Sequence, residues 1–272
     1  MCVLPKQQQA LPLVASSRHA WLMAEHTHDG DTPRATDGTS GSTSGSAHQD
    51  TDHSGPRHGG LNLHEDADNA ADMWDGMYRE RPKVWSGNPN PQLVAEVAGL
   101  PAGTALDIGC GEGADAIWLA GQGWTVTGMD VSAVALERAA AHAVESGYAD
   151  RITWQQQDLA EWKPEPIFDL VSAQFLHSPL LPWRDSVASA AAAVAPGGTL
   201  LVVGHHPHGL APWSHHRETG MFFSPEQLAG GLRLDREPWF VNVLTSRERT
   251  MTGPEGGTVT VLDTVLRATK HP

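Results

Sequence analysis

A short glycine-rich segment constrains the fold of this chain more than any other feature. The sequence "ALDIGCGEG" (105–113) places three alternating glycines directly after a short apolar run, with Asp107 just before the first of them. Glycines at such positions let the backbone turn sharply and approach a ligand closely. The segment therefore predicts a buried strand followed by a ligand-binding loop.

Strands and helices are expected to alternate from this loop onward. Short, continuously apolar runs are typical of parallel strands that are covered on both faces. Repeated strand–helix–strand units predict a doubly wound sheet with helices on both faces. We expect strands at 104–108, 125–129, 151–156, 168–173, 199–204, 239–245 and 258–267, helices at 91–99, 113–123, 133–146 and 183–195 and another beginning at 224–227, with Ser132 as a helix cap and the "PGG" of 196–198 ending the helix before it.

The N-terminal quarter of the chain lacks the pattern of a folded domain. Residues 36–46 ("TDGTSGSTSGS") have the composition of a flexible linker. Six histidines flank it with irregular spacing and without a cysteine, so we expect a solvated tail rather than a metal site. The sequence therefore predicts a disordered, His- and Gly/Ser-rich tail over residues 1–64 and one folded domain over residues 65–272, with Met23 as an alternative start.

The overall charge and cysteine content restrict the partners and the compartment. The chain has 272 residues and a formal net charge of −14, which should repel nucleic acid and anionic membranes. Its two cysteines, Cys2 and Cys110, are unsuited to a structural disulfide, which favours a cytoplasmic location. No apolar run approaches the roughly 18 residues that cross a membrane.

Polar side chains follow the expected parallel strands at the point where each strand ends. Ligands of doubly wound sheets bind beyond these carboxyl ends. We therefore expect the side chains to converge on one crevice. They are Asp107, Asp130, Asp158, Gln174, His177, His205 and His206.

A dinucleotide site is the first interpretation of the glycine loop. The segment "GCGEGA" fits the G-x-G-x-x-A fingerprint, and Asp130 follows at about the ~20-residue spacing of a ribose-binding acidic residue. Asp107 argues against it, because a carboxylate there would face an incoming pyrophosphate. Asp158 adds a further polar anchor, and the folded part leaves little room for a separate substrate domain. An NAD(P)-dependent oxidoreductase is kept as an alternative.

Five motifs in this order resemble those of class I S-adenosylmethionine-dependent methyltransferases. They are "ALDIGCGEG", "TGMDVS", "QQQDL", "FDLVSAQFLH" and "APGGTLLVV", within a resemblance over residues 88–267. "KVWSGNPNP" and the segments "FSPEQL" and "VLDTVLRA" are similar to the small-molecule branch that includes tellurite-resistance and thiopurine methyltransferases. The resemblance implies S-adenosyl-L-methionine as cofactor and a Rossmann-like doubly wound α/β sheet, mostly parallel with an antiparallel C-terminal strand.

The resemblance also implies a role for each candidate residue. Asp107 suits the ammonium group of the cofactor, and Asp130 suits both ribose hydroxyls because a carboxylate has two acceptor oxygens. Val131 is expected to lie against adenine, and Asp158 to accept from its amino group. The implied cofactor-binding residues are Trp85, Asp107, Gly109, Cys110, Gly111, Asp130, Val131, Asp158, Leu159 and Gln174.

The implied reaction is direct, in-line methyl transfer to a small molecule. A general base is needed only when the accepting atom carries a proton; His177 is the expected base, with His205 and His206 next. The stretch "SAQFLHSP" stands where nucleic-acid amino-methylating enzymes carry an Asn-Pro-Pro-Tyr-type signature, and two cysteines are too few for arsenite. A hydroxyl, a carboxyl, a thiol and a soft anion such as tellurite stay open as acceptors. A non-catalytic S-adenosylmethionine-binding protein is a further alternative.

Overall fold

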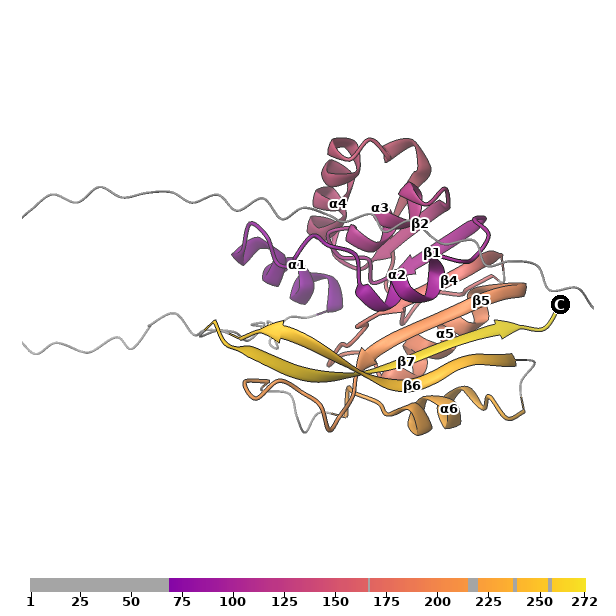
Figure 1. The fold of residues 1–272 in the computed structure, drawn as a ribbon. Coiled ribbons are helices and arrows are strands. Elements are labelled where there is room, and N and C mark those ends of the chain that lie inside the picture. The colour runs from indigo at the N-terminus through magenta and orange to yellow at the C-terminus, as the bar shows by residue number, and fades with distance from the viewer. Residues whose placement is uncertain (1–68, 166, 215–219, 237–238, 254–255) are drawn as a thin grey trace, which may run out of the picture. The chain divides into compact units, whose positions relative to one another are not determined.

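A computed structural model describes residues 69–165, 167–214, 220–236, 239–253 and 256–272 (Figure 1). The predicted tail over residues 1–64, and the start of order predicted near Leu63, lie outside these residues. The rest contains a seven-stranded sheet of order β3-β2-β1-β4-β5-β7-β6. Strand β7 runs antiparallel to both of its neighbours, and the other pairs are parallel, as the sequence predicts. The strands are β1 (Thr104–Ile108), β2 (Thr125–Asp130), β3 (Ile152–Gln156), β4 (Phe168–Gln174), β5 (Val194–His205), β6 (Trp239–Thr252) and β7 (Thr258–Lys270).

Six α-helices and a short 3-10 helix (η1, Ala149–Arg151) are found among the described residues. The predicted N-caps are confirmed. The Ser132 hydroxyl accepts a hydrogen bond from the Ala135 N–H at the start of α4. A complete capping box joins Ser224 and Gln227 at the start of α6. None of the described helices has the length and apolar character needed to cross a membrane. The helices are α1 (Ala70–Glu80), α2 (Pro91–Val97), α3 (Ala114–Gly121), α4 (Ala133–Glu145), α5 (Trp183–Ala193) and α6 (Pro225–Leu232).

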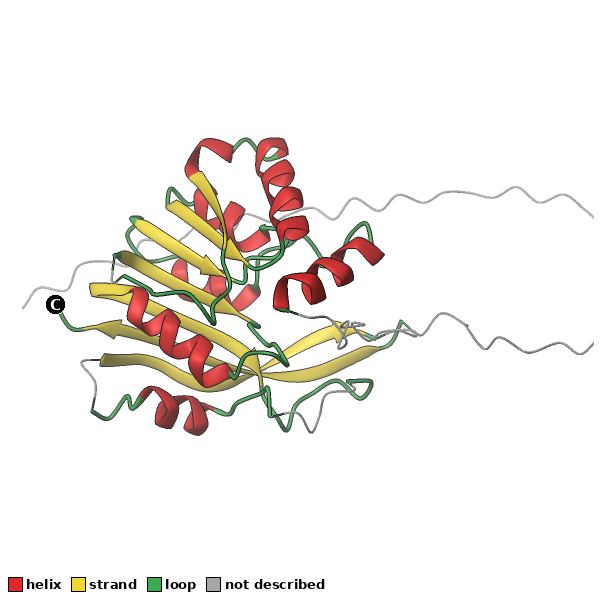
Figure 2. Cartoon of the chain, turned by 180° about the vertical axis from the view of Figure 1, so that it is seen from behind, coloured by secondary structure: helices red, strands yellow, loops and turns green. Residues whose placement is uncertain are grey.

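Helices cover both faces of the sheet (Figure 2). Side chains alternate along a strand, so Leu106 and Ile108 of β1 join the core under α5 and α6. Ala105 joins the opposite core, which α2, α3 and α4 supply. Asp107 follows the same alternation, so its side chain lies on the α3 side of the sheet, one residue before the end of β1. Burial of both sheet faces explains why these strands are continuously apolar.

Two predictions about the C-terminal half are wrong. Helix α5 ends at Ala193, and the "PGG" of 196–198 lies inside β5 rather than at the end of a helix. The register against β4 shifts between Phe168 and Leu170, and Gly197 has a φ of 79°, so this segment forms an irregularity within the strand. Strands β6 and β7 are also longer than predicted. The prediction ended β6 too early because residues 246–252 are mostly polar and lie on an edge strand that is only partly buried.

Candidate functional site

The glycine loop between β1 and α3 folds back over the end of β2. The N–H groups of Gly109 and Cys110 both donate to the Met129 carbonyl, at 2.8 and 3.0 Å. Gly109 has a φ of 68°, and a Cβ there would lie 2.6 Å from Cδ1 of Leu176. A side chain would therefore be strained by its backbone and would also strike the loop after β4. The loop holds the shape that the sequence predicts.

Asp107 is a buried carboxylate with an oxygen that has no protein partner. The Ala116 N–H donates to the carboxyl group. Its Oδ2 has no hydrogen-bond partner among the described residues. Burial raises the pKa of Asp107 well above its ordinary range, and the nearby Asp115 and Asp130 raise it further. The carboxylate form at this position lacks a positive partner within the described chain.

Gln174 at the end of β4 has a similar unmet acceptor. Its Nε2 donates to the Ser172 hydroxyl at 3.0 Å, while the buried Oε1 has no partner among the described residues. Asp107 is paired with Ser172 in the parallel β1–β4 ladder. Two buried oxygens without a donor thus lie at the carboxyl ends of neighbouring strands, where a ligand that donates hydrogen bonds would satisfy both.

Asp130 ends β2 directly beside the glycine loop. Its Oδ2 accepts from the Gly111 N–H and its Oδ1 from the Ser132 N–H, both at 2.9 Å. Burial raises the pKa of Asp130, although these backbone hydrogen bonds oppose the rise. The Val131 N–H also donates to this carboxylate, so three backbone donors engage it and about one of its four acceptor sites stays free.

A cavity of about 260 Å³ lies at the carboxyl ends of β2 and β3, where Val131, the residue after Asp130, is part of its lining. Val131 and Asp158 both line it, so the structure brings together the two residues that the resemblance assigns to adenine. The Asp158 Oδ1 accepts from the Ala160 N–H at 2.8 Å, which fixes the turn after β3. The Leu159 side chain packs against the core under α5 and α6. The resemblance assigns only the backbone N–H of Leu159 to the adenine ring.

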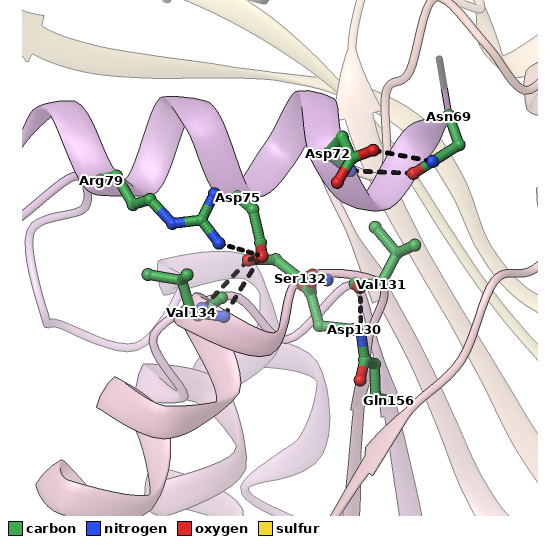
Figure 3. A network of polar contacts seen from close by, with 10 residues as sticks. Asn69, Asp72, Asp75, Arg79, Asp130, Val131, Ser132, Val134 and Gln156 are labelled. Atoms are coloured by element: carbon green, nitrogen blue, oxygen red, sulfur yellow. Dashed lines mark hydrogen bonds and ion pairs between the residues drawn. The ribbon is translucent and has the colours of Figure 1, made fainter. Parts of the chain in front are cut away.

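Helix α1 is fixed beside this cavity by a buried carboxylate that sequence reasoning missed. Asp75 accepts from the Ser132 hydroxyl at 2.5 Å and from the Val134 N–H at 3.2 Å, and it pairs with Arg79 at 2.8 Å (Figure 3). The start of α1 then contributes residues 69 and 71 to the cavity lining. An aspartate on the buried face of an amphipathic helix was the signal in the sequence.

A second missed carboxylate, Glu112, fastens the segment before α2 to the glycine loop. Its buried side chain accepts from the Trp85 N–H at 3.1 Å and forms an ion pair with Arg138 at 2.9 Å. The Trp85 indole N–H donates to the Tyr78 hydroxyl at 2.9 Å. A Cβ on Gly111 would lie 2.9 Å from that hydroxyl and 3.0 Å from the indole nitrogen, so Trp85 lies against the loop. The indole is still 41% exposed.

Cys110 takes part in the loop through its backbone. The residue is partly buried, and desolvation raises the pKa of its thiol, with Asp130 and Asp107 raising it further. A thiol with a raised pKa stays protonated at neutral pH and is a poor nucleophile. Among the described residues there is also no cluster of three or more side chains that would hold a metal ion.

His177 occupies a different environment from the one expected for a base. Its Nδ1 lies 3.0 Å from the Met221 carbonyl, and its Nε2 accepts from the His205 N–H at 3.0 Å. Burial and the neighbouring His205 lower the pKa of His177 to about 3. Both ring nitrogens are therefore engaged by backbone groups, and the predicted role of His177 as general base does not fit this geometry.

Comparison with known proteins supports the interpretation of the glycine loop as part of a methyltransferase domain. Residues 105–198 match a family model described as a methyltransferase domain. Thiocyanate methyltransferase 1 of Brassica oleracea is 34% identical over 101 residues, covering 36% of this chain and 45% of that relative. The 2-heptyl-1-hydroxyquinolin-4(1H)-one methyltransferase of Mycobacteroides abscessus is 30% identical over 148 residues, covering 50% of this chain and 65% of that relative. The chain thus spans about half to two thirds of the length of these curated relatives.

Solved structures share the fold. A structure from a study of the conversion of a disulfide bond into a thioacetal group during echinomycin biosynthesis has a TM-score of 0.60 and 24% identity, covering 75% of this chain and 92% of that one. TehB from Haemophilus influenzae has a TM-score of 0.54 and 15% identity, covering 74% of this chain and 66% of that one. The comparisons favour a class I methyltransferase domain over the dinucleotide-binding alternative.

Proposed function

We propose that this chain, which carries a class I methyltransferase domain, binds S-adenosyl-L-methionine at the carboxyl ends of β1, β2 and β4 and transfers its methyl group to a small molecule. The family model covers residues 105–198, which include the glycine loop. The side chains around this loop suit the separate parts of that cofactor.

The buried acceptor pair formed by Asp107 Oδ2 and Gln174 Oε1 carries the proposal. Buried polar atoms are nearly always hydrogen-bonded, and an ammonium group would supply donors to both. A pyrophosphate offers no such donor and would place negative charge beside a buried carboxylate. The pair therefore suits the amino-acid end of S-adenosylmethionine better than a dinucleotide.

The neighbouring strand ends fit the nucleoside part of the cofactor. Asp130 keeps acceptor capacity for the ribose, and the next residue, Val131, lines a cavity together with Asp158. The apolar side chain of Val131 would contact the face of adenine, and the second oxygen of Asp158 would accept from its amino group. Trp85 and the segment that Glu112 fastens would cover the glycine loop and exclude water.

When bound, S-adenosylmethionine supplies a methyl group on a positively charged sulfur. The protein then has to hold the acceptor in line with that methyl group and keep water out. We infer a small-molecule acceptor because the related enzymes are named for thiocyanate and a heptylhydroxyquinolone. The net charge of −14 argues against nucleic acid and anionic membranes as partners. The free Cys110 thiol suits a reducing, cytoplasmic setting.

Calorimetry with S-adenosylhomocysteine tests the proposal. The wild-type chain should bind it and show no heat with NAD or NADP. Asp130→Asn should weaken binding about 10- to 100-fold, because a hydrogen bond to a charged group contributes roughly 1.5–3 kcal/mol. Asp150→Ala, at an exposed position in η1, is the matched control and should bind like the wild type.

Each alternative has its own result in this experiment. Absence of S-adenosylhomocysteine binding by the wild-type chain refutes the proposed function, and binding of NAD alone favours the oxidoreductase. Unchanged affinity in Asp130→Asn removes the ribose assignment. Binding without methyl transfer to a broad panel of acceptors favours a non-catalytic binding protein.

A further inference from the structure

A polar and aromatic cluster lies at the carboxyl end of β5, next to the end of β4. His205 ends β5, and its Nδ1 lies 3.5 Å from Oδ1 of Asp263 on β7. The two residues oppose each other directly in the antiparallel β5–β7 ladder. Opposed residues project from the same face of a sheet, so strand register itself sets this contact.

Asp263 is fully buried and is held in place from the neighbouring strand. Arg249 on β6 donates to its two oxygens, from Nε at 2.7 Å and from Nη2 at 3.2 Å. Burial alone raises the pKa of Asp263, but hydrogen bonds from His205 and Arg249 outweigh burial and lower it. Asp263 is therefore ionised at neutral pH and can only accept hydrogen bonds. A carboxylate that faces Nδ1 favours the neutral tautomer of His205 with the proton on Nδ1 and the lone pair on Nε2.

His205 also has the exposure that His177 lacks. Its side chain is 37% exposed, and its Nε2 has no partner among the described residues. The His177 ring stacks beside it at a centroid distance of 5.4 Å and stays neutral because its pKa is lowered to about 3. The titratable and charged groups that face His205 are thus His177 after β4, Asp263 on β7 and Arg249 on β6.

Phe175 connects this cluster to the proposed cofactor site. It directly follows Gln174, and its ring centroid lies 4.6 Å from that of His205. Its φ of 51° is uncommon for a residue with a bulky side chain, and its N–H donates to the Val203 carbonyl of β5 at 2.7 Å. Strain of this kind persists where the surroundings enforce it, often at functional sites. Gln174 itself pairs with Val203 in the β4–β5 ladder, two residues before His205.

We propose that His205, oriented by Asp263, is the general base of the reaction and that the acceptor is a small molecule with a hydroxyl or thiol group. This inference rests on the proposed function. The oxygen or sulfur of the acceptor loses its proton to Nε2 of His205 and forms a bond to the methyl carbon. The electron pair of the broken carbon–sulfur bond stays with the sulfur, giving S-adenosylhomocysteine. The resulting imidazolium is paired with the Asp263 carboxylate and returns its proton to water.

The substrate class follows from the need for a base. An acceptor that is already an anion, such as thiocyanate or iodide, has no proton to lose and gains nothing from His205. A hydroxyl or thiol is activated by proton removal, for which a positioned base typically contributes 10²–10⁴-fold. We therefore separate this chain from the thiocyanate methyltransferase to which it is 34% identical over 101 residues.

Two measurements on the full chain test the proposal. In the first, S-adenosylhomocysteine formation is followed with a panel of phenols and thiols and with thiocyanate and iodide. We expect turnover of at least one phenol or thiol, and a drop of about 100-fold or more in His205→Gln. His208→Gln, an exposed neighbour outside the cluster, should retain wild-type activity. Calorimetry should give the same affinity for S-adenosylhomocysteine in all three proteins.

The second measurement follows the imidazole itself and needs no acceptor. Long-range 1H–15N NMR of the wild-type chain, assigned with His205→Gln, should show His205 as the Nδ1–H tautomer when neutral. In Asp263→Asn the preference for the Nδ1–H tautomer should weaken, because the carboxylate that faces Nδ1 is gone. A matching fall in kcat should appear with the phenol or thiol that the wild-type chain methylates.

Four results overturn the proposal in a chain that binds S-adenosylhomocysteine. They are full phenol or thiol methylation by His205→Gln, preferred turnover of thiocyanate or iodide, absence of turnover with every phenol and thiol, and a wild-type Nε2–H tautomer. Failure of the wild-type chain to bind S-adenosylhomocysteine is a different outcome, because it refutes the proposed function rather than the assignment of the base.

Discussion

Asp107→Asn should strengthen the ligand-free fold and weaken cofactor binding at the same time. The wild-type carboxyl group is buried, with Oδ2 lacking a partner among the described residues and with Asp115 and Asp130 nearby. Asparagine has nearly the same shape and an oxygen that can accept from the Ala116 N–H. The substitution therefore removes the charge and leaves the packing almost unchanged.

The effect on binding follows from the loss of a charged hydrogen bond. Such a bond contributes roughly 1.5–3 kcal/mol, so the Asp107→Asn variant should bind S-adenosylhomocysteine about 10- to 150-fold more weakly. The pKa of Asp107 is raised in the free protein, and a cationic ligand favours its carboxylate form. Wild-type affinity should accordingly increase as pH rises, and the increase should be absent in the variant.

The effect on stability has the opposite sign. A carboxyl group whose folded-state pKa is raised contributes stability below its unfolded pKa of about 3.9 and loses it as pH rises through the folded value. The wild-type chain therefore loses stability toward neutral pH, and asparagine avoids this loss. At neutral pH the ligand-free variant should melt at a higher temperature, by roughly 2–4 °C for each kcal/mol gained in a chain of this size.

Denaturation and calorimetry on the same two proteins decide this prediction. The expected pattern is a higher melting temperature without ligand and a weaker, pH-independent affinity with it. A less stable variant would show that Asp107 is satisfied within the fold. Unchanged affinity would show that the ammonium group binds elsewhere, and either result refutes the reasoning.

Three more substitutions test separate contacts. Gly111→Ala adds a Cβ 2.9 Å from a tyrosine hydroxyl at a position with a φ of 52°, so it should lower the free energy of unfolding more than Gly147→Ala, where φ is 77° but the surrounding space is open. Urea denaturation measures both free energies. Equal losses of about 1–2 kcal/mol would indicate that backbone strain alone is responsible. Glu112→Gln removes the partner of Arg138 and should destabilise the chain by about 3 kcal/mol, with S-adenosylhomocysteine affinity reduced; unchanged unfolding would contradict this. His177 has a depressed pKa of about 3, so stability should fall by up to about 1.4 kcal/mol per pH unit as pH drops below about 6.5, and His177→Gln should remove that slope in pH-dependent denaturation.

The cofactor side of the fold was predictable because its signals are local. The glycine loop, the strand before it and the cap at Ser132 depend on residues within a few positions of each other. Asp107 and Asp130 follow from the rule that parallel strands present their carboxyl ends at one edge. Asp107 is buried at the end of β1, and the partly buried Asp130 accepts from the loop's Gly111 N–H.

The contacts missing from the sequence interpretation join residues far apart in the chain. Asp75 meets Ser132 across 57 positions, and Glu112 meets Trp85 across 27. Each carboxylate lies in a segment whose own pattern indicates only a helix or a loop. The length of β6 was missed for another reason, since its outer half is polar and carries no alternating apolar pattern.

The assignment of the base shows the same limit. Position after β4 made His177 the natural candidate, but hydrogen bonds to two backbone segments engage both of its nitrogens. The pairing of His205 with Asp263 depends on the register of an antiparallel ladder, which the sequence does not specify. A histidine's position after a strand end therefore predicts that it lies near the site. It does not predict whether its ring nitrogens are engaged by hydrogen bonds within the fold.

A crystal structure of the full chain with S-adenosylhomocysteine tests the central claim most directly. The account predicts the ligand's ammonium nitrogen within hydrogen-bond distance of Asp107 Oδ2 and Gln174 Oε1, its ribose hydroxyls on Asp130, and its adenine in the cavity that Val131 and Asp158 line. A ligand bound elsewhere, or one that leaves Asp107 Oδ2 and Gln174 Oε1 without a donor, would contradict it.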